Sequence, residues 1–233
     1  MHYAWLIWSL LLLIPWGIIY ILLPSASKRH EMLVVSLWTS LIGITEPFFV
    51  PLYWNPPSLL DLAWRTGFDI ESFIFSFGIG GIAILAYDRF FRARDTRVTS
   101  REKRLSRHRF HLLALLLAPA SFFVLFSTAS LNPIYSAILA MIAGGIATWY
   151  CRPDLKNKMF ASALIFLAIY FVYFLTLIAL FPGYVEQVWN LKALSGIRLV
   201  GIPLEELLFA TSFGFIWSSV YEHATWRRFM KTS

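Results

Sequence analysis

Charged residues and cysteine are scarce in this chain. Only 14% of its 233 residues are charged, whereas 58% are hydrophobic, and the mean hydropathy is +0.66. A composition this apolar excludes an ordinary soluble domain and indicates a protein that crosses the membrane several times. Cys151 is the sole cysteine, which excludes an internal disulfide framework.

Cofactor and metal motifs are also missing. No G-x-G-x-x-G motif follows a strand, so we expect no bound dinucleotide and no other cofactor. His108 and His111 lie in a basic loop, and we expect them to have no acidic or cysteine partners and to form no metal site. The net charge of +7 would suggest nucleic acid in a soluble protein. Here the basic residues separate apolar spans, so we expect contact with anionic lipid and no nucleic-acid partner.

The hydrophobic runs predict an all-α membrane protein with seven transmembrane helices. The expected spans are about 3–23, 31–53, 69–91, 110–128, 131–150, 159–181 and 201–223. Each has about 20 residues, which at 1.5 Å per residue spans a hydrocarbon core of about 30 Å. The first run lacks a basic start and a small-residue cleavage site, so we expect a retained helix rather than a signal peptide.

Loop charge predicts how these spans are oriented. Of the 20 lysines and arginines, 17 fall on one side of the predicted membrane, and nine of those lie between Arg89 and Arg109. Only Arg65, Lys192 and Arg198 fall on the other side. The positive-inside rule therefore places the N-terminus outside and the C-terminus in the cytoplasm of a multi-pass cell-membrane protein.

An internal repeat relates the two halves of the chain. Shifted by 134 residues, segment 69–75 (DIESFIF) lies on segment 203–209 (PLEELLF), so that Glu71 matches Glu205 and Gly80 matches Gly214. Four helices separate the third span from the seventh, so both copies cross in the same direction. We expect a parallel 3+1+3 repeat, with the first unit at 1–109, a connecting helix at 110–128 and the second unit at 129–233.

Four acids are candidate catalytic residues because ionisable groups inside a bilayer are costly and are usually functional. Glu205 and Glu206 begin the last span, Glu71 begins the third, and Glu46 lies about 22 Å from the cytoplasmic end of the second. All four fall in the outer third of the predicted membrane. A protonated carboxyl beside an ionised one suits general acid–base chemistry. The alternative is that each acid merely favours a helix N-terminus near water.

Aromatic residues surround these acids in the sequence. The nearest are Phe48, Phe49, Phe73, Phe75 and Phe209. Aromatic faces can stabilise a cation that has no hydrogen-bonding groups, so these are candidate substrate-binding residues. For any single one of them, ordinary packing and lipid contact are the better explanation.

The PLEE signature of 203–206 and its first copy DIES resemble the small membrane-bound lycopene cyclases, whose two three-span domains occur as separate subunits or as one fused chain. The resemblance implies that an acyclic carotenoid such as lycopene is cyclised in the bilayer, with a β-ring favoured over an ε-ring. An acid would protonate the terminal double bond, and a base would remove a proton after ring closure. It further implies Glu205 and Glu206 as the acid–base pair, with Glu71 and Glu46 as modulating partners. Asp69 and Ser72 depart from the signature, which favours the second half as the better site.

Two other functions remain open from the sequence. Seven helices, an outside N-terminus and this repeat also resemble the microbial rhodopsin topology, which suggests a retinal- or carotenoid-binding protein. Those proteins carry a lysine in the last span, and 201–223 contains none. A proton-coupled transporter would also use buried carboxylates, but more often at broken helices near the midplane. A homo-oligomer is compatible with the sequence. The sequence does not determine the ring type, the length of the carotenoid or the number of its ends that are cyclised.

Overall fold

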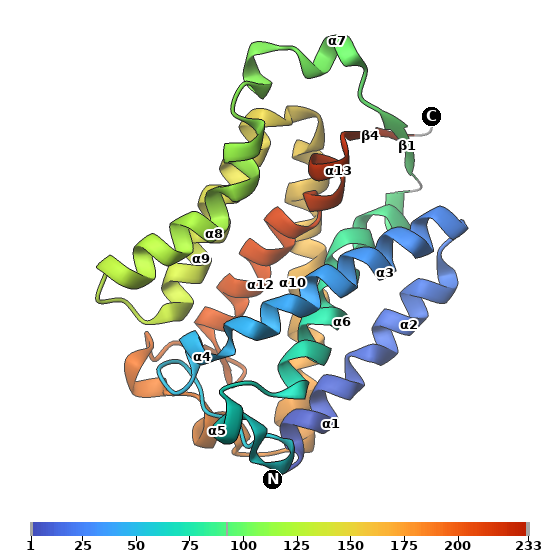
Figure 1. Ribbon diagram of the computed structural model, residues 1–233. Helices are drawn as coiled ribbons and strands as arrows, with labels where there is room; N and C mark the ends of the chain where they lie inside the picture. The colour runs from blue at the N-terminus through green and yellow to red at the C-terminus, as the bar shows by residue number, and fades with distance from the viewer. Residues whose placement is uncertain (1, 92, 232–233) are drawn as a thin grey trace.

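Helices make up most of the fold. A computed structural model describes residues 2–91 and 93–231 (Figure 1). Within these residues, helical stretches occupy all seven ranges expected from hydropathy. They are α1 (Ala4–Leu11) with α2 (Leu13–Leu22); α3 (Ala26–Ser40) with the 3₁₀ helix η1 (Leu41–Thr45) and α4 (Glu46–Phe49); α6 (Ile70–Phe91); α8 (His111–Thr128); α9 (Pro133–Cys151); α10 (Lys156–Leu180); and α12 (Leu204–Trp217) with α13 (Val220–Thr225).

Five of these stretches are long and apolar enough to cross a membrane. They are Ala4–Leu22, Ala26–Phe49, Ser106–Thr128, Pro133–Cys151 and Pro153–Leu180. A sixth is added if Leu59–Thr66 and Ile70–Leu85, which meet at 97°, form one bent span. The last expected span consists of α12, with 14 residues, and the shorter α13. The structure thus gives five or six candidate spans, and seven stays a prediction.

The shorter elements lie at the two ends of the bundle. They are η2 (Leu59–Asp61), α5 (Leu62–Thr66), β1 (Ala93–Arg97), α7 (Ser100–Lys103), η3 (Ser106–His108), η4 (Pro153–Leu155), α11 (Tyr184–Val188), η5 (Leu191–Ala193), β2 (Arg198–Leu199), β3 (Ile202–Pro203) and β4 (Arg227–Lys231). The N-terminus, α5 and the orange segment 181–203 share one end, and α7, β1 and β4 share the other (Figure 1). The loops with few and with many basic residues thus lie at opposite ends of the bundle, and the side of the membrane that each end faces stays a prediction.

Two antiparallel strand pairs were not expected from hydropathy. β1 pairs with β4, from Ala93 opposite Lys231 to Arg97 opposite Arg227, and β2 pairs with β3. The ion pair between Arg228 and Glu102 ties β4 to α7. Main-chain hydrogen bonding at Thr99, and then the Arg228 guanidinium, hold the pKa of Glu102 below its usual range. The basic loop is therefore folded against the C-terminal strand.

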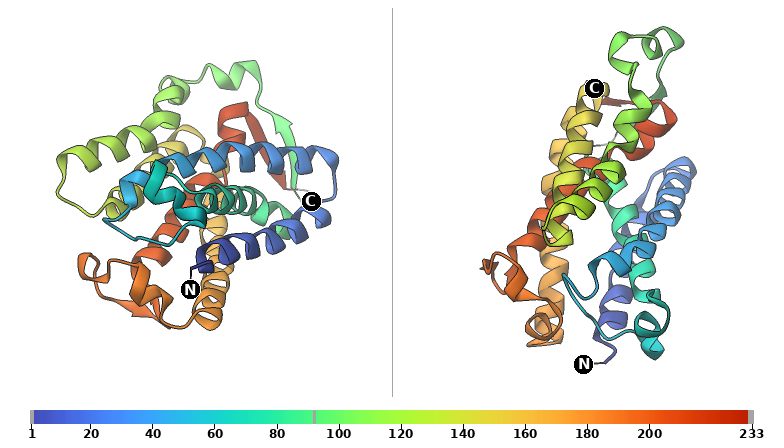
Figure 2. Two further views of the ribbon diagram at one scale, coloured as in Figure 1. Left: turned by 60° about the horizontal axis from the view of Figure 1, so that its bottom comes forward. Right: turned by 60° about the vertical axis from the view of Figure 1, so that its left-hand side comes forward.

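The helices gather in two groups. Figure 2 (right) shows α1 to α6 on one side and α8 to α12 on the other, and contacts of α6 with α10 and α12 join the groups. Trp8 of α1 and Tyr173 of α10 stack with ring centroids 4.4 Å apart, and the Tyr173 hydroxyl donates to the Trp8 carbonyl at 2.6 Å. An aromatic core thus lies between the two halves.

Candidate functional site

An apolar cavity of about 380 Å³ lies between the two groups of helices. Residues of α1, α4, α6, α8, α9, α10 and α12 line it, so both halves of the chain contribute. Its walls are mainly aromatic, including Trp5, Trp8, Phe49, Phe75, Phe122, Phe209, Phe213 and Trp217. Two carboxyl groups, those of Glu46 and Glu206, line the same cavity.

Glu206 is held by three hydrogen-bond donors. It lies in the first turn of α12 and is 5% exposed. The Tyr53 hydroxyl and the Trp189 indole N–H, at 2.8 Å, donate to Oε1, and the Tyr170 hydroxyl donates to Oε2 at 2.6 Å. The three donors come from segments far apart in the chain. This carboxyl is therefore fixed in direction at the cavity wall.

Glu46 faces the cavity from the first half. The helix that begins at Ala26 tightens into the 3₁₀ helix η1 just before Glu46, which opens α4. Such a tightening within a longer helix often marks a functional position. Glu46 is 7% exposed, and its Oε1 has no hydrogen-bond partner among the described residues. Glu46 is thus the buried carboxyl that the first half of the chain places at the cavity wall.

Glu71 and Glu205, unlike Glu46 and Glu206, bind the main chain of loops outside the cavity. Both side chains are buried, and neither lines the cavity. Glu71 accepts a hydrogen bond from the Leu59 main-chain N–H at 2.7 Å, and Glu205 accepts one from the Ser195 N–H at 2.8 Å. Glu205 also accepts from the Tyr135 hydroxyl at 2.6 Å. Each of these acids anchors the loop that precedes its own helix.

The five candidate phenylalanines also separate into two groups. Phe49, Phe75 and Phe209 line the cavity. Phe48 instead packs on α8, with ring centroids 5.7 Å from Phe123, and Phe73 lies against Gly43. The last two do not line the cavity and contribute to helix packing.

Sequence reasoning missed the polar aromatic residues around Glu206. Tyr53, Tyr170 and Trp189 come from three segments far apart in the chain. A buried tyrosine hydroxyl or indole N–H usually finds a hydrogen-bond partner. Tyr170 lies in the middle of an apolar run, so its position in the sequence could have predicted a polar partner within the bundle.

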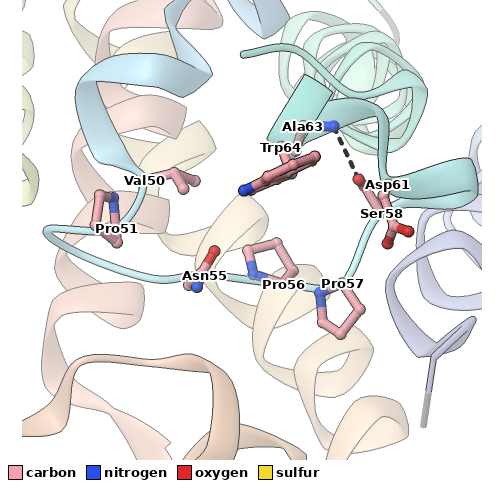
Figure 3. A pocket seen from close by; sticks show the side chains of 9 residues that line it. All are labelled: Val50, Pro51, Asn55, Pro56, Pro57, Ser58, Asp61, Ala63 and Trp64. Carbon is pink, nitrogen blue, oxygen red and sulfur yellow. Dashed lines mark hydrogen bonds between the residues drawn. The ribbon is translucent and has the colours of Figure 1, made fainter. Parts of the chain in front are cut away.

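A second cavity of about 630 Å³ lies at the end of the bundle that holds the N-terminus (Figure 3). It is lined by the loop that precedes α5 and by residues of α5 itself. In its wall, the Ser58 hydroxyl accepts a hydrogen bond from the Ala63 N–H at 2.9 Å. Asp61 is the one carboxyl group that lines it. None of the four candidate acids reaches this cavity, so it offers no acid–base pair.

The expectation that His108 and His111 have no cysteine partner is wrong. Cys151 Sγ lies 3.3 Å from His108 Nδ1 and 3.5 Å from His111 Nδ1. Sequence reasoning missed this contact because 40 residues separate Cys151 from His111. The cluster lies at the opposite end of the bundle from the anchored loops and takes no part in the aromatic cavity.

Comparison with known proteins finds one similarity, in the second half of the chain. Residues 132–224 match the family model described as Lycopene cyclase, a range that contains Glu205, Glu206, Tyr170 and Trp189. No curated protein and no solved structure matches the chain. The family is one of membrane enzymes of carotenoid cyclisation, in keeping with the long apolar helices. Over residues 132–224, the chain is similar to the lycopene cyclase family.

Proposed function

We propose that this protein converts the open ends of lycopene, or of a related acyclic carotenoid, into β-rings within the bilayer. One observation carries the proposal: Glu46 and Glu206 line the same apolar aromatic cavity from the two halves of the chain. An apolar pocket with a few convergent polar groups is the usual form of a site for a hydrophobic ligand. The family match supports carotenoid cyclisation as the reaction class.

The reaction needs one proton to be given and one to be taken. Protonation of the terminal double bond leaves a carbocation, an internal double bond attacks it to close the ring, and loss of a proton restores neutrality. No net electrons move, so the proposal requires no redox cofactor. The two cavity carboxyls would share these steps, because a general acid or base must lie within hydrogen-bond reach of the proton it moves.

The cavity wall suits the intermediate. A carbocation has no hydrogen-bonding groups, and aromatic faces attract a cation through their quadrupole. Phe75 and Phe209 line the cavity together with Trp5 and Trp8. The Glu206 carboxylate, held by its three donors, would add a fixed negative charge in a medium of low dielectric.

This assignment changes the pairing expected from the sequence. We propose Glu46 and Glu206 as the proton-transferring pair, and Glu71 and Glu205 as residues that position the loops at the cavity's outer end. Glu205 would act on the reaction through the main chain at Ser195, which it holds at 2.8 Å. The site then spans both halves instead of residing in the second half alone.

We further propose a seven-span, 3+1+3 arrangement with the N-terminus outside and the C-terminus in the cytoplasm, as a fused form of the two-subunit cyclases. The matched contacts of Glu71 with Leu59 and of Glu205 with Ser195 support the repeat, because equivalent acids anchor equivalent loops. The basic loops would meet anionic lipid of the cell membrane. A homo-oligomer fits the same proposal.

Expression of the chain in a lycopene-accumulating bacterial host tests the function. Chromatography of the extracted pigments should show cyclic carotenoids at the expense of lycopene, with β-rings as the product. Membranes that contain folded protein and only unchanged lycopene would show that lycopene is not the substrate. Failure on longer acyclic carotenoids as well would overturn the proposed cyclase and favour a transporter.

A further inference from the structure

Three side chains of types that can bind a metal ion meet at the end of the bundle that carries α7 and β4. His108 closes η3, His111 opens α8 and Cys151 closes α9. Their ligand atoms, two imidazole nitrogens and one sulfur, all lie within 4.8 Å of one another. His108 and Cys151 are buried, and His111 is half-buried.

The spacing of these atoms suits a tetrahedral metal ion. With metal–sulfur and metal–nitrogen bonds of about 2.3 and 2.0–2.1 Å, a sulfur and a nitrogen ligand lie roughly 3.5 Å apart. The two sulfur–nitrogen distances found here are 3.3 and 3.5 Å. The two histidine nitrogens lie within 4.8 Å of each other.

His223 is a fourth imidazole beside the cluster. Its ring packs edge-on against His111 with centroids 4.5 Å apart, and its Nδ1 lies 3.2 Å from the Thr148 hydroxyl. Its Nε2 has no hydrogen-bond partner among the described residues, although the side chain is 1% exposed. A buried imidazole nitrogen without a partner is costly, and this ring packs directly against one of the three side chains.

An arginine and an ion pair lie beside the cluster. The Arg107 Nε–H donates a hydrogen bond to His108 Nε2 at 3.4 Å, so the proton of this imidazole lies on Nδ1. Metal binding at Nδ1 needs the tautomer with the proton on Nε2. That tautomer forms if the partly exposed Arg107 side chain turns away. Arg152 is bound to Asp154, at 2.7 Å. Thiolate is the form of cysteine that binds metal, and the binding of a metal ion displaces the thiol proton.

We propose that His108, His111 and Cys151 form a binding site for Zn²⁺, with His223 or water in the fourth position. Two imidazoles and a thiolate are borderline-to-soft ligands, which favours zinc over magnesium or calcium. The ion would link the start of α8 to the end of α9, two helices in extensive contact. The proposal is independent of the cyclase reaction.

Metal binding by the purified protein tests the site. The full chain, in detergent and with an affinity tag free of histidine, is stripped with a chelator, incubated with Zn²⁺ and desalted. We expect one zinc per chain for the wild type, and loss of binding in Cys151→Ser and His108→Ala. His30→Ala is the matched control, because His30 is an exposed histidine on α3, and it should keep its zinc.

Cobalt substitution guards against variants that fail to fold. Co²⁺ bound to a thiolate gives a charge-transfer absorption in the near ultraviolet, and Cys151 is the sole cysteine of the chain. That band in the wild type therefore reports ligation by Cys151 without any substitution. The proposal is overturned if the wild type retains neither metal after desalting, if Co²⁺ binds without this band, or if Cys151→Ser and His108→Ala bind zinc as the wild type does.

Discussion

Tyr170 and Glu206 join two adjacent helices at the wall of the aromatic cavity. The Tyr170 hydroxyl of α10 donates a hydrogen bond of 2.6 Å to Oε2 of Glu206 in the first turn of α12. The neighbouring acid, Glu205, instead faces Tyr135 and the main chain at Ser195. Adjacent residues on a helix point about 100° apart, so one acid of the pair reaches the cavity and the other reaches a loop.

Glu206→Gln should abolish ring formation. We expect a loss of about 10²–10⁴-fold, the contribution usual for a general acid or base, because the amide can neither give nor take the proton. Glu205→Gln is the matched control and should keep measurable activity, since it alters only the loop anchor. Cyclic pigment is measured per amount of folded protein in the membrane. Wild-type ring formation by Glu206→Gln would remove this residue from the reaction.

The same comparison applies to the first half. Glu46→Gln should lose activity to a similar extent, because Glu46 is the other carboxyl that lines the cavity. Glu71→Gln should retain detectable ring formation, since Glu71 is bound to the Leu59 N–H and does not line the cavity. If Glu71→Gln is inactive while Glu46→Gln cyclises normally, the proposed pairing across the cavity is incorrect.

Tyr170→Phe should weaken catalysis without disrupting the fold. The substitution removes one of the donors to Glu206, a charged hydrogen bond worth about 1.5–3 kcal/mol, which corresponds to a rate loss of roughly 10–100-fold. Tyr173→Phe is the matched control on the same helix, because its hydroxyl donates to the Trp8 carbonyl and not to Glu206. Turnover is measured with lycopene in vesicles. Equal rates for the two variants would separate Tyr170 from the reaction.

Single cysteines test the proposed orientation. Ser100 and Ala193 are exposed at opposite ends of the bundle, and the native Cys151 is only 2% exposed. A membrane-impermeant thiol reagent applied to intact cells should label Ala193→Cys and leave Ser100→Cys unlabelled until the cells are opened. The wild type supplies the background. Labelling of Ser100→Cys in intact cells would show that the orientation is the reverse of the proposed one.

Hydropathy located the helical stretches because a span needs about 20 apolar residues whatever its neighbours are. The direction of a side chain within a span was less accessible. Glu46 reaches the cavity through the 3₁₀ helix η1, a local change of twist that a regular period does not contain. The donors Tyr53 and Trp189 reach Glu206 from loops whose paths depend on tertiary packing.

The contact between Cys151 and His111 was not predicted, although the expected topology contained the information for it. Cys151 was expected at the end of one span and His111 at the start of the preceding one, and consecutive antiparallel helices return to the same end of a bundle. The predicted topology therefore already placed the two residues at the same depth. Sequence proximity was the wrong criterion for finding a histidine's partner.

Gly214→Ala should destabilise the fold where α12 crosses α10. A Cβ at Gly214 would lie 2.8 Å from the Phe166 Cβ and 2.9 Å from the Ser162 carbonyl oxygen, so the helix main chains themselves would have to separate. Small residues permit such close approach between membrane helices, and overpacking typically costs about 1–3 kcal/mol.

Gly17→Ala is the matched control, because a Cβ at Gly17 meets no atom within 4 Å. Alanine there should be neutral or stabilising, since glycine weakens a helix interior by roughly 0.5–1 kcal/mol. The fraction of each variant that stays monodisperse in detergent after heating provides the measurement. A Gly214→Ala protein that survives heating as well as Gly17→Ala would show that the two helices are not packed this closely.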